Sequence, residues 1–299
     1  MAQFKLNTPV LFLVFNRPGP TKKVFEEIKR ARPSKIYIAA DGPREGKLGE
    51  KEKCEEVIKI VSDIDWSCEV KTLFRKKNLG CGKAVSSSID WFFGEVDRGI
   101  ILEDDCLPDQ SFFRFCQELL KEYQDDERIT QISGSNFMGE TNIEESYLFS
   151  EKHNAWGWAT WKRVWKFYDY NLSNFKELHK KDRLKSFKET PLQSIAGRRK
   201  FSKLLKKELD TWDYQWIFSC RLQNGLCIVP KKNLIQNIGF QEGTHTIKKK
   251  DFYLDKSGID FPLKHPKYVF NDVVYDKNFS DFFLGSKPKQ IIRKILRLD

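Results

Sequence analysis

Three consecutive carboxylates, Glu103, Asp104 and Asp105, follow directly after the apolar run at residues 99–102. Adjacent negative charges repel one another, so the triplet needs either access to water or a positive partner such as a divalent cation. Carboxylates can hold Mg²⁺ or Mn²⁺ while leaving coordination positions for the oxygens of a diphosphate. The triplet therefore predicts a cation site, although a solvated corner between strand and loop would have the same composition.

The elements that must position these carboxylates follow from the hydrophobic pattern. Apolar runs predict strands at residues 9–15, 34–40, 69–74 and 99–102, and helical patterns at residues 21–31, 50–64 and 80–93 lie between them. Strands that alternate with helices indicate a parallel α/β sheet with right-handed crossovers.

Polar residues follow three of the predicted strands. Asn16 and Arg17 come after the first strand, Asp41 after the second, and the carboxylate triplet after the fourth. Ligands of such sheets bind at the carboxyl ends of the strands. We therefore expect these side chains to line one edge of the sheet and to form the site.

The segment RKKNLGCGK at residues 75–83 combines positive charge with glycine. Gly80 and Gly82 permit close approach of the backbone to a ligand, just before a helix whose N-terminus favours anions. Gly80 and Lys83 are therefore candidates for binding a phosphate-bearing ligand. The segment is neither a Walker A loop nor a GxGxxG fingerprint, and a solvated basic turn explains each lysine equally well.

Composition limits the classes of protein. With 299 residues and 40% hydrophobic content, the chain can bury a sizeable core. No segment resembles a signal peptide or reaches the ~20 apolar residues of a spanning helix, so we expect a soluble, cytoplasmic protein. The net charge of +11 is compatible with nucleic acid, anionic lipid or a phosphate-bearing ligand. Nucleic acid is disfavoured because no helix-turn-helix, RNP or zinc-finger pattern is present.

The cysteine, tryptophan and histidine residues are less specific. The seven cysteines lack CxxC spacing and are interpreted as free thiols, with packing roles for Cys54, Cys106, Cys116 and Cys220. Trp158, Trp161 and Trp165 recur at helical spacing and are expected in the core, whereas Trp156 beside Gly157 is a candidate for stacking on a sugar. Of the histidines, only His245 in its Gly-Thr-His loop is a candidate metal or phosphate contact. Surface positions are expected for His153, His179 and His265.

The order of several segments carries a family resemblance. VLFLVFNR, IYIAADGP, GIILEDDCLPDQSFFRF, ISGSN, AWGWATWKRVW, WDYQW and IGFQEGTHT together resemble the GT-A glycosyltransferases, and most of all the N-acetylglucosaminyltransferase I group, over about residues 9–246. The most specific element is the EDD strand end with Phe112 and Phe113 behind it. The resemblance implies a GT-A-like α/β fold, with a mostly parallel, Rossmann-like sheet flanked by helices and an acceptor-binding second half.

The resemblance also implies an activity and a set of roles. The activity is inverting transfer of a sugar from a nucleotide diphosphate sugar, with a UDP-sugar favoured, assisted by Mn²⁺ or Mg²⁺. The implied roles are Asp105 as metal ligand, Asp104 facing the ribose or sugar, Glu103 orienting the turn, Asp41 contacting the base, Arg17 beside the nucleotide, Asp213 as catalytic base, and His245 where the closing loop meets the diphosphate.

Chemistry supports one base and one metal, because single displacement forms no covalent intermediate. Two features depart from the family pattern. The basic stretch between Asp169 and Leu209 looks longer than the corresponding link, and Tyr214 stands where an acidic residue is frequent. Asp210 therefore remains a rival for the base.

We divide the chain into a nucleotide-sugar half at residues 1–150, an acceptor and catalytic-base half at 151–250, and a C-terminal extension at 251–299. Within the extension, Pro288 can start a helix with an apolar face rimmed by Lys and Arg. Such a helix could lie in an anionic membrane interface, or dock on the protein's own core or on a partner subunit.

The sequence therefore favours a metal-dependent glycosyltransferase of surface polysaccharide or lipopolysaccharide synthesis, acting on a glycan or lipid-linked acceptor. The alternatives are a nucleotidyltransferase and a catalytically silent protein that binds a nucleotide sugar or another anion. The segment VFNRPGPTKK after the first strand does not supply the glycine-rich loop expected of a nucleotidyltransferase.

Overall fold

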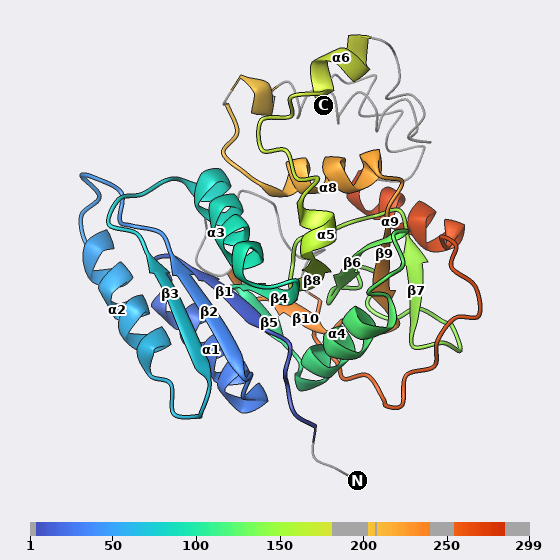
Figure 1. Ribbon diagram of the computed structural model, residues 1–299, viewed down its shortest axis with the longest axis horizontal. Coiled ribbons are helices and arrows are strands. Elements are labelled where there is room, and N and C mark those ends of the chain that lie inside the picture. Colours follow the sequence, from blue (N-terminus) through green and yellow to red (C-terminus); the bar gives the residue numbers. More distant parts are fainter. Residues whose placement is uncertain (1–3, 181–202, 207, 240–253, 285–299) are drawn as a thin grey trace.

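The computed structural model describes residues 4–180, 203–206, 208–239 and 254–284. These residues form a mixed α/β structure around an eight-stranded sheet with the order β3-β2-β1-β4-β8-β6-β9-β7 (Figure 1). Its first half is parallel and consists of β1 (Val10–Val14), β2 (Lys35–Ala40), β3 (Glu69–Phe74) and β4 (Arg98–Glu103). The order 3-2-1-4 is that of doubly wound nucleotide-binding sheets.

The second half of the sheet is mixed. Strand β8 (Trp158–Trp161) runs antiparallel between β4 and β6 (Ile129–Ser133), and β9 (Leu226–Pro230) is parallel to β6. Strand β7 (Tyr147–Ser150) is antiparallel to β9 at the edge. Because only β7 and β8 run against the other strands, the predicted fold class, a mostly parallel sheet flanked by helices, is confirmed.

The first helices lie where doubly wound connections place them. Helix α1 (Pro18–Ala31) packs against α2 (Glu50–Ser62) and α4 (Gln110–Glu122). Helix α3 (Cys81–Glu95) instead contacts β1 and the short α5 (Lys162–Trp165). Helix α1 begins at Pro18, whose fixed φ suits a first helical position, and it buries Val24, Phe25 and Ile28 at helical spacing.

Further elements complete the described part. A small antiparallel pair joins β5 (Cys106–Pro108) to β10 (Ile235–Asn237). The remaining helices are α6 (Phe175–Lys180), α8 (Asp213–Leu222) and α9 (Val273–Leu284). No described helix is long and apolar enough to cross a membrane.

The core confirms the packing roles expected from the sequence. Trp158, Trp161 and Trp165 are buried, and Trp158 also packs against Trp212 and Trp216 of the 212–216 segment. The four cysteines predicted to be packing residues are buried and free: Cys54, Cys106, Cys116 and Cys220. Aromatic packing thus joins the segment that carries the candidate base to the centre of the sheet.

One expectation is wrong. His153 is buried, not exposed, and its Nε2 lies 2.8 Å from the hydroxyl of Thr130. Burial disfavours the charged imidazole and lowers the pKa of His153 to about 3. His265 is exposed as predicted, and its Nδ1 lies 2.8 Å from the hydroxyl of Tyr147.

Several predicted features lie outside the described residues. They are His245, the tail at residues 285–299 with its amphipathic pattern, and most of the basic stretch that precedes Leu209.

Candidate active site

The carboxyl ends of β1, β2 and β4 lie side by side, because these strands are parallel neighbours with Leu13 opposite Ala39 and Glu103. The ends therefore bring Arg17, Asp41 and the carboxylate triplet to one edge of the sheet, as the sequence predicts.

Arg17 is the positive partner of the triplet in the described structure. Its Nη2 and Nε donate to Oδ1 and Oδ2 of Asp104, the latter at 3.3 Å, and its Nη1 donates to Oδ2 of Asp105 at 3.0 Å. Asp104 is buried, whereas Asp105 retains 17% side-chain exposure. One guanidinium therefore holds both carboxylates in a fixed geometry.

Burial controls the charge state of this cluster. It raises the pKa of Asp104 to about 6, although Arg17 acts in the opposite direction. Burial also raises the pKa of Glu103 well above its ordinary value, and the neighbouring charges of Asp105 and Asp104 add to the effect. Burial lowers the pKa of Arg17, but the two aspartates outweigh it and the pKa lies above the ordinary value. Glu103 is thus biased towards its protonated form.

Asp41 organises two loops of the same edge. Its carboxylate accepts hydrogen bonds from the backbone N–H of Gly42 at 3.0 Å, from that of Leu79 at 3.1 Å, and from Nδ2 of Asn78 at 2.9 Å. Burial raises the pKa of Asp41, although these backbone bonds act against the rise. The loops after β2 and β3 are therefore joined through one carboxylate. Asn78, in an Asn-Leu-Gly turn, was missed from the sequence.

Asp210 occupies the N-terminus of α3. Its Oδ1 accepts a hydrogen bond from the backbone N–H of Gly82 at 2.8 Å, and a Cβ atom added to Gly82 would lie 2.7 Å from that oxygen. A carboxylate of the chain itself thus uses the anion-binding end of the helix beside Gly80. Lys83, in the first turn of α3, is exposed.

Asp213 is half-buried at the start of α8, and the hydroxyl of Thr211 donates to its Oδ1. Its charge contributes to the raised pKa of Glu103. Asp210 reaches the start of α3 through its bond to Gly82, three residues before Asp213 in the chain. The structure therefore brings both candidate bases towards the edge that carries the triplet.

The segment after β10 closes over Asp105. The backbone N–H of Ile238 donates to the carbonyl oxygen of Asp105 at 2.8 Å. A Cβ atom on Gly239 would lie 2.8 Å from Nη1 of Arg17 and 2.9 Å from Cβ of Asp105, so only glycine fits there without displacement. Gly239 leaves no signal in the sequence, because its role depends on a contact with a distant part of the chain.

Trp156 is half-buried, and its ring packs against Phe137 with centroids 5.0 Å apart. The neighbouring Gly157 has φ +59°, and a Cβ atom there would lie 2.7 Å from Cγ1 of Ile235. Close packing of the chain on Ile235 therefore accounts for this glycine.

The carboxylates at this edge fit a hard cation that is held mainly by the oxygens of a bound diphosphate. Among the described residues, no three His, Cys, Asp or Glu side chains converge as a ready metal site. Asp105 keeps Oδ1 on the side of the Cys106 thiol, 3.5 Å from Sγ, while Oδ2 is bound by Arg17. Mg²⁺ commonly takes one or two carboxylates and completes its shell with phosphate oxygens and water.

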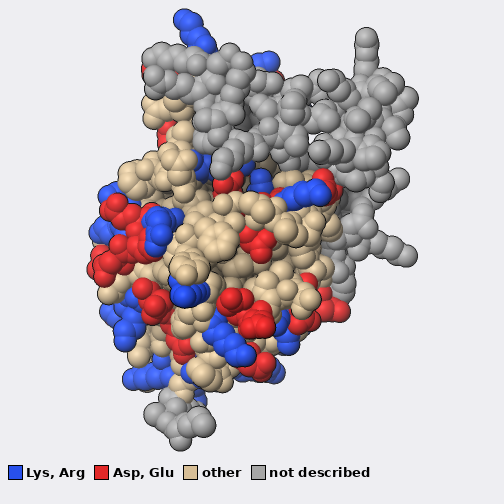
Figure 2. Space-filling view, turned by 90° about the vertical axis from the view of Figure 1, so that its right-hand side faces the viewer, with Lys and Arg blue, Asp and Glu red and all other residues tan. Residues whose placement is uncertain are grey.

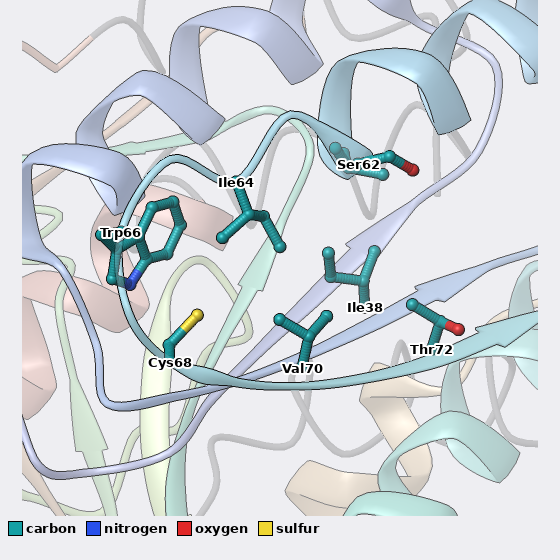
Figure 3. Close-up of a pocket in the computed structure, with 8 residues that line it drawn as sticks. Ile38, Ser62, Ile64, Trp66, Cys68, Val70 and Thr72 are labelled. Atoms are coloured by element: carbon teal, nitrogen blue, oxygen red, sulfur yellow. The ribbon is translucent and has the colours of Figure 1, made fainter.

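A cavity of about 370 Å³ with both apolar and polar lining lies elsewhere, between the end of α2 and β3 (Figure 3). Its lining contains none of the predicted site residues and includes Ile38, Val61, Ile64, Trp66 and Val70.

No family model and no curated protein matches the chain. Among solved structures, the chain is similar to a UDP-glucose pyrophosphorylase complexed with UDP-glucose, with a TM-score of 0.42 and 9% identity over 79% of this chain and 95% of that chain. It is also similar to a cytidylyltransferase from Leptospira borgpetersenii serovar Hardjo-bovis, with a TM-score of 0.34 and 12% identity over 54% and 63% of the two chains.

A third similar structure is S. aureus TarS 1-349, with a TM-score of 0.37 and 8% identity over 54% of this chain and 48% of that chain. The chain thus spans about half the length of TarS 1-349 and less than two thirds of the cytidylyltransferase. Similarities of this size carry no argument about activity, so the function has to be inferred from the site itself.

Proposed function

We propose that the protein is an inverting, metal-dependent glycosyltransferase. It moves a sugar, with N-acetylglucosamine as one candidate, from a nucleotide diphosphate sugar to a glycan or lipid-linked acceptor in surface polysaccharide synthesis. The observation that carries the proposal is the shared edge of the sheet, where Arg17, Asp104 and Asp105 form one bonded cluster. Asp210, three residues before Asp213, bonds to Gly82 at the start of α3 beside that edge.

The donor would bind along the strand ends. In this proposal Asp41 contacts the base, and Arg17 and Asp104 lie beside the nucleotide and sugar. Gly80 and Lys83 approach the phosphates from beside the start of α3, where Asp210 holds the N–H of Gly82. Asp105 would hold Mn²⁺ or Mg²⁺, with His245 as a second contact. When bound, the cation offsets the charge of the diphosphate and acts as a Lewis acid on the leaving group.

Asp213 is the proposed base that takes the proton of the attacking acceptor hydroxyl. Asp210 is the weaker candidate because its carboxylate already accepts the N–H of Gly82 at the start of α3. Asp213 accepts instead from a hydroxyl, that of Thr211, which can turn to another acceptor without breaking a helix cap. A positioned base is the one protein group that single displacement requires besides the cation.

The second half of the chain supplies the proposed acceptor site. We assign residues 1–150 to the donor, 151–250 to the acceptor and base, and 251–299 to an extension. Trp156 remains the proposed sugar contact. Its ring is half-buried beside Phe137, which leaves part of the side chain accessible.

Product analysis tests the proposal. The protein is incubated with a panel of nucleotide sugars, with and without Mn²⁺, and with either candidate acceptors or pyrophosphate. The released nucleotides are then separated. Nucleoside diphosphate released only with Mn²⁺ supports glycosyl transfer. Nucleoside triphosphate formed from nucleotide sugar and pyrophosphate would instead identify a nucleotidyltransferase, and binding without turnover of any donor would identify a silent binding protein.

A further inference from the structure

Arg17 is held firmly where it meets the two aspartates. It immediately precedes α1, and its carbonyl oxygen accepts from the backbone N–H of Thr21 at 3.1 Å and from the Thr21 hydroxyl at 2.7 Å. These bonds fix the backbone from which the guanidinium extends. All three nitrogens of the guanidinium donate to Asp104 or Asp105.

The two aspartates are bound unequally. Asp104 receives two hydrogen bonds and is buried, whereas Asp105 receives one bond from Arg17, through Nη1, and keeps part of its surface exposed. The Asp105 bond is therefore the easier one to exchange. Buried Gly239 lies against both Nη1 and Asp105, so the space around this bond is small.

A divalent cation at Asp105 and the guanidinium compete for the same carboxylate. Both are positive, and like charges a few ångströms apart repel strongly where little water screens them. Arg stays protonated at all ordinary pH values, so it cannot relieve this repulsion by losing a proton. The other carboxylate oxygen, Oδ1, faces the thiol of buried Cys106. Movement of Nη1 away from Oδ2 is therefore what frees an oxygen for the cation.

We propose that Arg17 acts as an internal counter-cation that blocks Asp105, so that a divalent cation binds there only when Nη1 has left Oδ2. The bond pair to Asp104 then serves as the pivot, and the freed Nη1 points to a phosphate-bearing ligand. The inference rests on the proposed function, in which Asp105 is the cation ligand. It adds that cation and diphosphate arrive together, because the diphosphate gives Arg17 a new partner.

The test measures Mn²⁺ binding to the full chain without nucleotide, by the electron paramagnetic resonance signal of free Mn²⁺. Arg17→Met removes the competitor and keeps a long side chain. We expect it to bind Mn²⁺ about tenfold tighter than the unmodified protein, because a competent state that is rarely populated weakens apparent affinity in proportion. The gain should disappear in Arg17→Met/Asp105→Asn.

Arg75→Met is the matched control. Arg75 follows β3 at the same edge, but its guanidinium donates to the hydroxyls of Ser87 and Ser88 and not to the triplet. Loss of its charge should leave Mn²⁺ affinity within about twofold, since general electrostatics at a solvated edge are screened. If Arg17→Met is unstable alone, a larger rise of its melting temperature with Mn²⁺ than that of the unmodified protein gives the same answer.

Three outcomes would overturn the inference: equal affinities for Arg17→Met and the unmodified protein, an equal gain in Arg75→Met, or a gain that survives Asp105→Asn. None of these measurements uses a nucleotide or a transfer reaction. Failure to find glycosyl transfer would therefore reject the proposed function separately.

Discussion

The Asp105 side chain is more exposed than that of Asp104, at 17% against 4%, and its amide variant tests it directly. In Asp105→Asn the side-chain oxygen can still accept from Arg17, so we expect the fold and the melting temperature to be kept. A neutral amide is a poorer ligand for a hard cation, and turnover should fall by roughly 10²-fold or more. Unchanged release of nucleoside diphosphate with unchanged Mn²⁺ dependence would contradict the assignment.

Asp213 and Asp210 differ in their hydrogen-bond donors, which are the Thr211 hydroxyl for Asp213 and the Gly82 backbone N–H for Asp210. Asp213→Asn should leave donor binding nearly intact and lower the transfer rate by roughly 10²–10⁴, the usual contribution of a positioned base. Asp210→Asn keeps an oxygen for the N–H of Gly82 and should change the rate little, whereas Asp210→Ala should lower the free energy of unfolding by about 1 kcal/mol through the lost cap. Single-turnover rates for the three variants show which of the two carboxylates acts as the base. A slow Asp210→Asn beside a normal Asp213→Asn would make Asp210 the base.

At the scale of elements, α3 docks on the segment before α8 through Gly82. A Cβ atom at Gly82 would lie 2.7 Å from both Oδ1 of Asp210 and the backbone oxygen of Thr211. Gly82→Ala should therefore lower the free energy of unfolding by about 1–3 kcal/mol, as overpacking does. Gly94 in the same helix has no atom within 4 Å of such a Cβ, so Gly94→Ala should stabilise by about 0.5–1 kcal/mol. Urea unfolding of both variants measures the contrast, and a common effect would reject the docking role.

Glu50, in the first turn of α2, ties loops of the binding edge together. Its carboxylate accepts from the backbone and guanidinium of Arg44 and from Nδ2 of Asn16. Hydrogen bonding from Arg44 lowers the pKa of Glu50 to about 2, although burial acts against it. Since the folded pKa lies below the ordinary 4.5, this stabilisation is present above about pH 4.5 and is lost as the pH falls towards 2.

Glu50→Gln should therefore lower the free energy of unfolding at pH 7 by about 1–3 kcal/mol, and the deficit should shrink between pH 4.5 and pH 2. Glu55→Gln, which alters an exposed pair with Lys51 on the same helix, should cost less than about 1 kcal/mol at either pH. Denaturant titrations at pH 7 and pH 3 compare them. A deficit for Glu50→Gln that does not depend on pH would show that its charge is not the cause.

The sequence predicts which residues lie at the binding edge of the sheet, because the pattern that identifies them consists of neighbouring residues. A continuous apolar run marks each parallel strand, and the polar residues after it must lie at the carboxyl end, which places Arg17, Asp41 and Asp105 together. Contacts across the chain leave no such pattern. The bond of Asp210 to Gly82 spans 128 residues, and the closure of Gly239 over Asp105 needs β10 to pair with β5. The predicted surface position of His153 was wrong for the same reason, since its burial beside Thr130 depends on tertiary packing.

The site combines two parts of the chain that are far apart in the sequence and meet in the folded molecule. The first contributes the ends of β1, β2 and β4, and the second contributes residues 210–213 and 235–239. The aromatic packing of Trp158 with Trp212 and Trp216 fixes the second part on the sheet. Transfer between two substrates suits this arrangement, because each part can present one substrate to the other.

Four exposed apolar side chains lie in and just before the first turn of α9. They are Tyr268, Phe270, Val273 and Val274, with exposed fractions of 62%, 65%, 69% and 66%. Nζ of Lys267 lies 5.3 Å from the Tyr268 ring centroid. Figure 2 faces the right-hand side of Figure 1, and it shows uncharged surface interspersed with acidic and basic side chains. If the acceptor is lipid-linked, as proposed, aromatic and aliphatic side chains beside a lysine would suit an anionic membrane interface.

If these four side chains contribute to peripheral membrane association, Phe270→Ser/Val274→Ser should lower the affinity for anionic vesicles by roughly tenfold, since each apolar side chain contributes about 1.5–3 kcal/mol when fully buried and insertion is partial. Leu48→Ser is the matched control, because Leu48 is exposed as well but lies in the loop before α2. Cosedimentation with phosphatidylglycerol vesicles, and with phosphatidylcholine vesicles for comparison, measures the bound fraction. A chain ending at Ser286 tests the tail separately. Normal binding by the double variant with loss in the shortened chain would assign the anchor to the tail alone, and no binding by the full chain at low salt would reject membrane association by either segment.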